Sequence, residues 1–83
     1  MPNRLRSNVS GKEILKFFES YGFEIDKRTR GSHLVLHRKL SFGDQILVIP
    51  LHKTVSRGTL KAILKQSCKY IPEKDLFDNF YTK

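Results

Sequence analysis

One histidine follows a glycine and a hydroxyl side chain and opens an apolar run, in the stretch Gly31-Ser32-His33-Leu34-Val35-Leu36. Histidine is the side chain whose ordinary pKa lies nearest neutrality, so an exposed histidine can take or give a proton in a reaction. Side chains alternate along a strand, which predicts Leu34 and Leu36 on the buried face and His33 on the other. A single histidine at a strand end is most often an ordinary surface residue, but this context makes His33 our candidate catalytic residue.

Positive charge precedes this histidine. Lys27, Arg28 and Arg30 surround a turn that ends in Gly31 and Ser32. Backbone N–H groups near a glycine can hold a phosphate together with flanking cations. The same charges are equally expected on a solvated hairpin turn, so both interpretations stand open at this point.

The two other histidines differ in what they can contribute. His37 lies four residues after His33, and strand rise separates their backbones by roughly 13 Å, which makes His37 a poor direct partner. A turn centred near residues 41–42 would pair His33 with Pro50 and bring His52 to the same end of the sheet. We keep His52 as an auxiliary candidate, while slightly preferring a role in orienting the segment that follows it.

A helix is expected before this region. Ser10-Gly11-Lys12-Glu13 is typical of a capping box at a helix start, and Gly22 is typical of a helix end. The apolar positions between them recur at helical spacing and are expected in the core: Ile14, Leu15, Phe17, Phe18 and Tyr21.

Three strands should position the histidines, at residues 23–27, 33–38 and 45–49, as an antiparallel meander. In the first strand we expect Phe23 and Ile25 to face the core. The first nine residues form a basic lead-in that we expect to be loose in part.

Two helices are expected after the strands. Ser56 should cap a helix from Arg57 onward. Its expected buried face comprises Leu60, Ile63, Leu64, Ser67 and Cys68. Pro72 can open a short last helix, which we expect to dock through Leu76, Phe77 and Phe80.

A row of cations recurs every four residues along the helix after the strands, at Arg57, Lys61 and Lys65. Such a row can contact a nucleic-acid backbone. A solvated helix flank carries the same pattern, so both interpretations remain.

Length and charge limit the classes of function. A chain of 83 residues forms one domain, and 16 Lys and Arg against eight Asp and Glu leave a net charge of +8. This charge favours a polyanionic partner such as nucleic acid, or an acidic protein. No apolar run is long enough for a membrane and no signal-peptide pattern follows the start, so we expect a cytoplasmic protein. With Cys68 as the only cysteine, neither a disulfide nor a metal site or other cofactor is expected.

The predicted order of helix, three antiparallel strands, helix and short helix indicates an α+β fold close to that of the double-stranded RNA-binding domain, with its three-stranded sheet packed on helices. The chain also resembles the HicA toxin family over residues 10–66. The motifs that carry the resemblance are Ser10-Gly11-Lys12-Glu13-Ile14, Tyr21-Gly22-Phe23, Gly31-Ser32-His33, Ile49-Pro50-Leu51-His52-Lys53 and Gly58-Thr59-Leu60-Lys61-Ala62-Ile63-Leu64-Lys65-Gln66.

This resemblance implies the toxin of a type II toxin–antitoxin system. Such a toxin is a ribonuclease that cleaves messenger RNA without a metal ion, slows translation, and is held inactive by a HicB-type antitoxin. The family's catalytic histidine corresponds to His33, on the sheet face that the helices leave open. The antitoxin would cover that face, and oligomers would form only through its complex. The family often carries a second histidine directly after the first, where this chain has Leu34.

Two alternatives remain open on the sequence. A non-catalytic RNA-binding module needs the same fold and charge but gives His33 no chemical role. A basic protein-interaction subunit would use its charge to dock an acidic partner.

Overall fold

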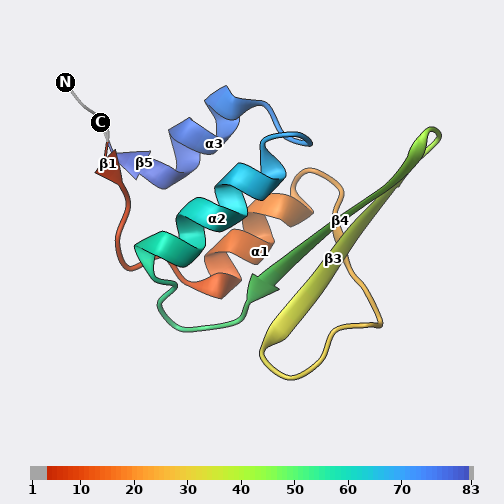
Figure 1. The fold of residues 1–83 in the computed structure, drawn as a ribbon, viewed down its shortest axis with the longest axis horizontal. Coiled ribbons are helices and arrows are strands. Elements are labelled where there is room, and N and C mark those ends of the chain that lie inside the picture. Colours follow the sequence, from red (N-terminus) through yellow and green to blue (C-terminus); the bar gives the residue numbers. More distant parts are fainter. Residues whose placement is uncertain (1–3, 83) are drawn as a thin grey trace.

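The computed structural model describes residues 4–82 and has the predicted order of elements, with two short strands added at its ends (Figure 1). Its elements are β1 (Arg4–Leu5), α1 (Gly11–Glu19), β2 (Glu24–Ile25), β3 (His33–Leu40), β4 (Gly43–Pro50), α2 (Arg57–Ser67), α3 (Glu73–Phe80) and β5 (Tyr81–Thr82). The α+β fold with its three-stranded antiparallel sheet and closing helix is therefore confirmed.

The sheet has the strand order β2-β3-β4, and the pairing of β3 with β4 follows the predicted register. His33 lies opposite Pro50, and the turn contains only residues 41–42 because Leu40 pairs with Gly43. Both strands are longer than predicted, since a two-residue turn is sufficient to join antiparallel strands. The strand pairing of β3 with β4 is therefore continuous from His33 to the hairpin turn.

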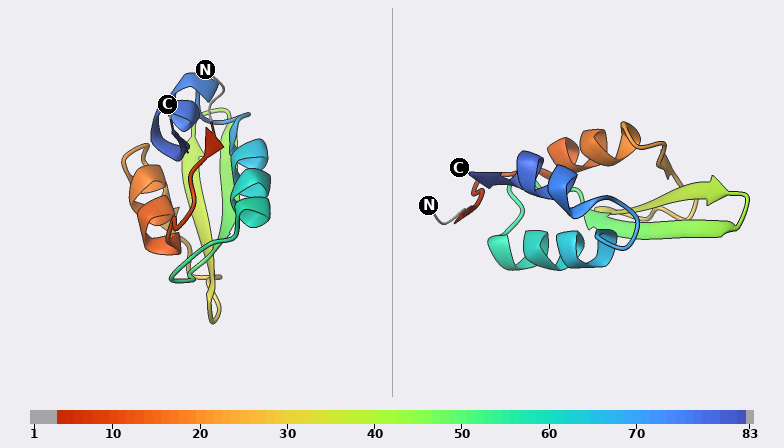
Figure 2. Two further views of the ribbon diagram at one scale, coloured as in Figure 1. Left: turned by 90° about the vertical axis from the view of Figure 1, so that its left-hand side faces the viewer. Right: turned by 90° about the horizontal axis from the view of Figure 1, so that it is seen from above.

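The helices lie on one side of this sheet, as Figures 1 and 2 show. Leu34 and Leu36 of β3 face the helices and are buried, together with Leu47 and Ile49 of β4. Their helical neighbours in the core include Ile14, Phe18 and Leu60. The alternate residues face the other side, which we call the open face: His33, Val35 and His37 of β3, and Ile46 and Val48 of β4.

The first sheet strand differs from the prediction. Phe23 is buried as expected, but Ile25 is 49% exposed and the next residue, Asp26, is buried instead. Ile25 lies on β2, at the edge of the sheet, and pairs with Leu36 of β3, while α1 and α2 both contact the opposite edge strand β4. The expectation of Ile25 in the core was wrong because no helix covers that end of the face.

Residues 4–9 differ from the loose lead-in expected. Arg4 and Leu5 pair with Thr82 and Tyr81, and Val9 is fully buried and bridges to Val55. The two ends of the described chain therefore hold each other in a small antiparallel sheet. Residues 1–3, the start of the expected lead-in, lie outside the described residues.

Both helix caps form, with one change. The Ser10 hydroxyl accepts from the Glu13 N–H, and the Ser56 hydroxyl accepts from the Thr59 N–H. The Glu13 carboxylate, expected to complete a capping box, accepts from the Arg6 guanidinium at 2.6 Å. The Glu13 carboxylate therefore pairs with Arg6 instead of completing the predicted capping box.

Two apolar side chains expected in the core lie at the surface. Cys68 is exposed although Leu60, Ile63, Leu64 and Ser67 are buried as predicted. Phe77 is 41% exposed, while Leu76 and Phe80 dock the last helix. Cys68 ends α2 as its C-cap, and Phe77 packs on Tyr81 rather than into the core.

Replacing Gly11 by Ala tests the packing between α1 and the end of β4. A Cβ atom at Gly11 would lie 2.2 Å from the Pro50 carbonyl oxygen, which is backbone and cannot turn away. We expect Gly11→Ala to lower the free energy of unfolding by about 1–3 kcal/mol, measured by urea denaturation.

Gly58→Ala is the matched control, because a Cβ atom there meets nothing within 4 Å. We expect this change in α2 to leave stability unchanged or to raise it by up to about 1 kcal/mol. Equal stability of the two variants would contradict the close approach of α1 to β4.

Candidate functional site

His33 is the first residue of β3 and is exposed on the open face. A two-residue turn precedes it, in which Arg30 and His33 exchange backbone hydrogen bonds of 3.0 and 3.2 Å. Gly31 occupies this turn with a φ of +56°, a conformation that glycine adopts without strain. Gly31 and Ser32 therefore set the direction from which the chain enters β3.

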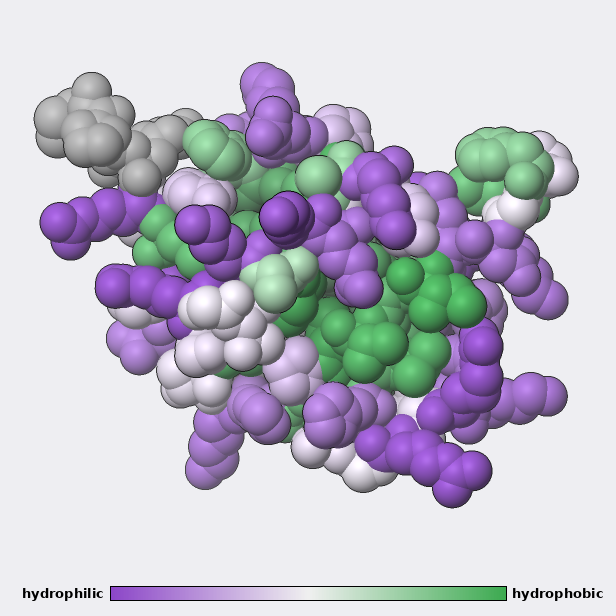
Figure 3. Space-filling model, in the orientation of Figure 1, coloured by the Kyte–Doolittle hydropathy of each residue, from purple (hydrophilic) through white to green (hydrophobic). Residues whose placement is uncertain are grey.

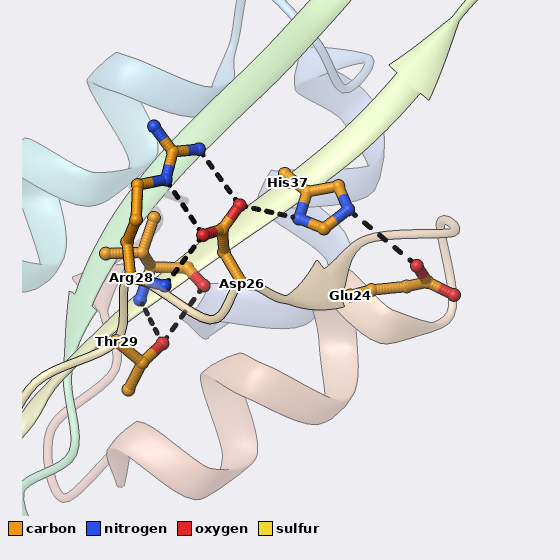
Figure 4. A network of polar contacts seen from close by, with 6 residues as sticks. Glu24, Asp26, Arg28, Thr29 and His37 are labelled. Carbon is orange, nitrogen blue, oxygen red and sulfur yellow. Dashed lines mark hydrogen bonds and ion pairs between the residues drawn. The ribbon is translucent and has the colours of Figure 1, made fainter.

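A network of polar contacts holds the loop between β2 and this turn (Figure 4). The Asp26 carboxylate accepts from the Arg28 guanidinium at 2.8 and 2.9 Å and from the Arg28 backbone N–H at 2.8 Å. The Thr29 hydroxyl accepts from the Val35 N–H at 3.0 Å, and the Asp26 N–H donates to the Val35 carbonyl at 2.7 Å. These bonds tie the loop to β3 two residues beyond His33.

The ionised form of Asp26 is favoured strongly. Hydrogen bonds from the Arg28 side chain and backbone, with smaller contributions from the charges of Arg28 and His37, hold the pKa of Asp26 well below its usual range. Burial of the carboxylate opposes this shift. Asp26 therefore remains an anion at neutral pH, and the pKa of Arg28 is raised by the same pair.

His37 lies between two carboxylates, an arrangement that the sequence analysis did not predict (Figure 4). Its Nδ1 atom is 3.0 Å from Asp26 Oδ2 and its Nε2 atom is 3.8 Å from Glu24 Oε1. The Nδ1 atom is buried and has no hydrogen-bond partner among the described residues. The alternation Glu24-Ile25-Asp26 was the available signal, because it places the carboxylates of Glu24 and Asp26 on the same side of the extended chain.

The predicted cations of the loop lie around this cluster. Lys27 and Arg30 are exposed, and the Arg28 side chain is 60% exposed although it binds Asp26. A cavity of about 450 Å³ on the open face is lined by Lys27, Arg28 and His37, and also by Lys39. Lys39 was missed, because it was expected in a turn and instead belongs to β3.

The cations of α2 lie elsewhere. Arg57, Lys61 and Lys65 are exposed on α2, which packs against the sheet on the side opposite the open face. The structure thus separates two basic surfaces, one around the cavity at His37 on the open face and one on the helical side.

His52 lies at the predicted end of the sheet. The Leu51 N–H donates to the Ser32 carbonyl at 2.6 Å, and the His52 carbonyl accepts from the Gly11 N–H at 2.9 Å. Its side chain is exposed. The backbone of His52 therefore orients the start of α1, and its side chain lines a cavity with Ser10, Lys12 and Leu15.

The space-filling view shows hydrophobic side chains gathered over the middle of the sheet strands, with hydrophilic ones around them (Figure 3). Ile46 and Val48 of β4 are 37% and 44% exposed. Among residues 4–82 there is no cluster of three His, Cys, Asp or Glu side chains that could hold a metal ion. No helix in the same range is long and apolar enough to cross a membrane.

The comparison with protein families gives one match. Residues 11–67 match the family described as HicA toxin of bacterial toxin–antitoxin systems. Searches of curated proteins and of solved structures give no match. The matched residues run from the start of α1 to the end of α2 and include His33 with its loop.

Replacing Asp26 by Asn tests whether the carboxylate stabilises the loop. A group whose pKa is lowered on folding stabilises the protein above its unfolded pKa, near 4 for Asp, and this contribution is lost as the pH falls through the folded pKa. We therefore expect a lower Tm for Asp26→Asn at pH 7, and a difference from wild type that narrows below about pH 4.

Asp78→Asn is the matched control, since Asp78 is exposed and its one ion pair within residues 4–82 is with Lys74 on its own helix. Thermal unfolding followed by circular dichroism at several pH values measures both variants. A Tm difference for Asp26→Asn that is constant from pH 7 to pH 2 would contradict the role of its charge.

Proposed function

The chain belongs to the HicA family of toxins from bacterial toxin–antitoxin systems, and we propose that it cleaves messenger RNA as a metal-independent ribonuclease with His33 as its catalytic residue. The observation that carries this proposal is the position of His33. Its side chain is exposed on the face that no helix covers, directly after a turn fixed by backbone hydrogen bonds. A histidine placed there can reach an RNA strand on the open face.

In the proposed reaction, His33 removes the proton from a ribose 2'-hydroxyl. The 2'-oxygen then attacks the adjacent phosphorus, and the bond from phosphorus to the 5'-oxygen breaks. The 5'-oxygen takes a proton from a donor, so the products carry a 2',3'-cyclic phosphate and a 5'-hydroxyl. Base catalysis by one residue accounts for a factor of about 10²–10⁴, so positioning must supply a further part of the rate.

Positioning of the phosphate is assigned to the loop before His33. Lys27 and Arg30 are exposed, and the Arg28 side chain is 60% exposed although its guanidinium binds Asp26. The fixed backbone of Gly31 and Ser32 brings N–H groups to the same turn. Cations and backbone donors of this kind position a nucleic-acid backbone without reading its sequence.

The proton donor for the leaving oxygen has three candidates. His52 is the first, because the Leu51–Ser32 hydrogen bond holds its segment at the His33 end of the sheet. A lysine or a water molecule could serve in a slower reaction. His37 is not one of these candidates, because it lies beside Asp26 and Glu24, four residues along β3 from His33.

We further propose that a HicB-type antitoxin inhibits the toxin by covering the open face. Ile46 and Val48 offer exposed apolar contacts on the strand next to β3. The cations around them favour an acidic partner, since complementary charge speeds and orients association. Such a partner would cover His33 without entering a deep pocket.

Replacing His33 by Ala is the direct test. We expect cleavage of a purified transcript to fall by at least about 10²-fold, because the general base is lost. The Tm should stay near that of wild type, since an exposed strand end contributes little packing. Cleavage is measured by gel electrophoresis with a chelator present throughout.

Three outcomes separate the candidate functions. Cleavage by wild type in chelator, with loss in His33→Ala, supports the proposal. Cleavage at an equal rate by both proteins would remove His33 from the reaction. Binding of the transcript without cleavage by wild type would favour a non-catalytic RNA-binding module.

A further inference from the structure

A groove of about 370 Å³ lies between α2 and α3, on the helical side of the sheet. Its walls include Lys61 and Lys65 of α2, Phe77 of α3 and Tyr81 of β5. None of these residues belongs to the His33 site. Phe77 is 41% exposed, whereas Leu76 and Phe80 of the same helix are buried.

The aromatic wall of the groove is a stacked pair. The rings of Phe77 and Tyr81 have centroids 4.2 Å apart and planes inclined by 28°. Tyr81 is held by its strand pairing with Leu5, so it supports the more exposed ring of Phe77 from one side. A supported, exposed ring is a suitable surface for an unpaired nucleobase, because every base offers a flat π-face.

The opposite wall carries a row of cations. Arg57, Lys61 and Lys65 succeed each other at single helical turns, which extends the row over about 12 Å. A second cleft, lined by Arg4, Leu5 and Arg57, begins where β1 pairs with β5. The cations therefore continue from Lys65 and Lys61 at the groove to Arg57 and Arg4 at the second cleft.

The acidic residues of α3 do not cancel this charge. Asp75 accepts a hydrogen bond from the Tyr21 hydroxyl, on the side of α1, and Asp78 pairs with Lys74. Among the described residues that line the groove, Glu73 is the one acidic side chain.

We propose that this groove binds single-stranded RNA, with an unpaired base on Phe77 and the adjoining phosphates on Lys61, Lys65 and Arg57. The inference rests on the proposed RNA substrate but places a binding site on the face opposite His33. A single strand is favoured over a duplex because paired bases are stacked on each other and cannot reach a protein ring. The combination of stacked rings with a cationic row matches how proteins hold single strands without reading sequence.

Fluorescence anisotropy with a labelled ten-nucleotide oligoribonucleotide tests this site. Its riboses carry 2'-O-methyl groups, so the oligonucleotide has no 2'-hydroxyl and the proposed reaction cannot consume it. We expect Phe77→Ala to weaken binding by about 5- to 150-fold, the effect of losing one stacked base. Phe42→Ala is the matched control, because Phe42 is 81% exposed at the hairpin turn, far along the chain from the groove.

The lysines are tested by the salt dependence of the same binding. Lys61→Gln combined with Lys65→Gln should lower the slope of log Kd against log salt by about 1.4, or 0.7 for each lost phosphate contact. Thermal unfolding of each variant checks that it is folded. The same oligonucleotide annealed to its complement should compete more weakly than the single strand.

Binding by Phe77→Ala that equals wild type would overturn the site, as would an unchanged salt slope in the double lysine variant. Absence of oligonucleotide binding by wild type would also overturn it. Transcript cleavage by wild type and His33→Ala, measured separately, decides the proposed function whatever the groove does. The two proposals can therefore fail independently.

Discussion

The alternation of side chains along β3 is the constraint on which the rest of the structure depends. Leu34 and Leu36 must face the helices, and a shift of one residue would exchange them with His33, Val35 and His37. Burial of two leucines is worth roughly 3–6 kcal/mol against exposure, so the register is firmly set. The same constraint fixes His33 on the open face, and the position of the candidate site is a consequence of core packing.

Features that depend on local sequence could be predicted, and those that depend on distant contacts could not. The helix caps at Ser10 and Ser56 and the pairing of His33 with Pro50 follow from spacing and turn chemistry. The exposure of Ile25 depends on which edge of the sheet the helices cover. The sequence around Ile25 does not indicate which edge that is. The first nine residues were predicted to be loose in part, and the pairing of Arg4 and Leu5 with β5 was not predicted because it joins residues far apart in the sequence.

The candidate site shows the same division. His33 and the cations before it could be found from one stretch of sequence, because their spacing along the chain carries the signal. The contacts of His37 with Asp26 and Glu24 needed the register between β2 and β3, and that strand was too short to fix its pairing in advance. Distance along β3 correctly separated His37 from His33, and the structure gives His37 a place among carboxylates instead.

The backbone of the His33 turn is held more firmly than its imidazole. Asp26, Arg28 and Thr29 fix the loop through side-chain hydrogen bonds, whereas within residues 4–82 no side-chain hydrogen bond orients the His33 ring. If His33 is the general base, a ring that is free to turn lowers the rate of cleavage, because the ring must be oriented when RNA binds. If an antitoxin covers the open face, it excludes substrate from this ring while the groove between α2 and α3 stays exposed. An inhibited toxin would then keep its affinity for single-stranded RNA. The site that binds RNA, between α2 and α3, would be separate from the site that cleaves it, at His33.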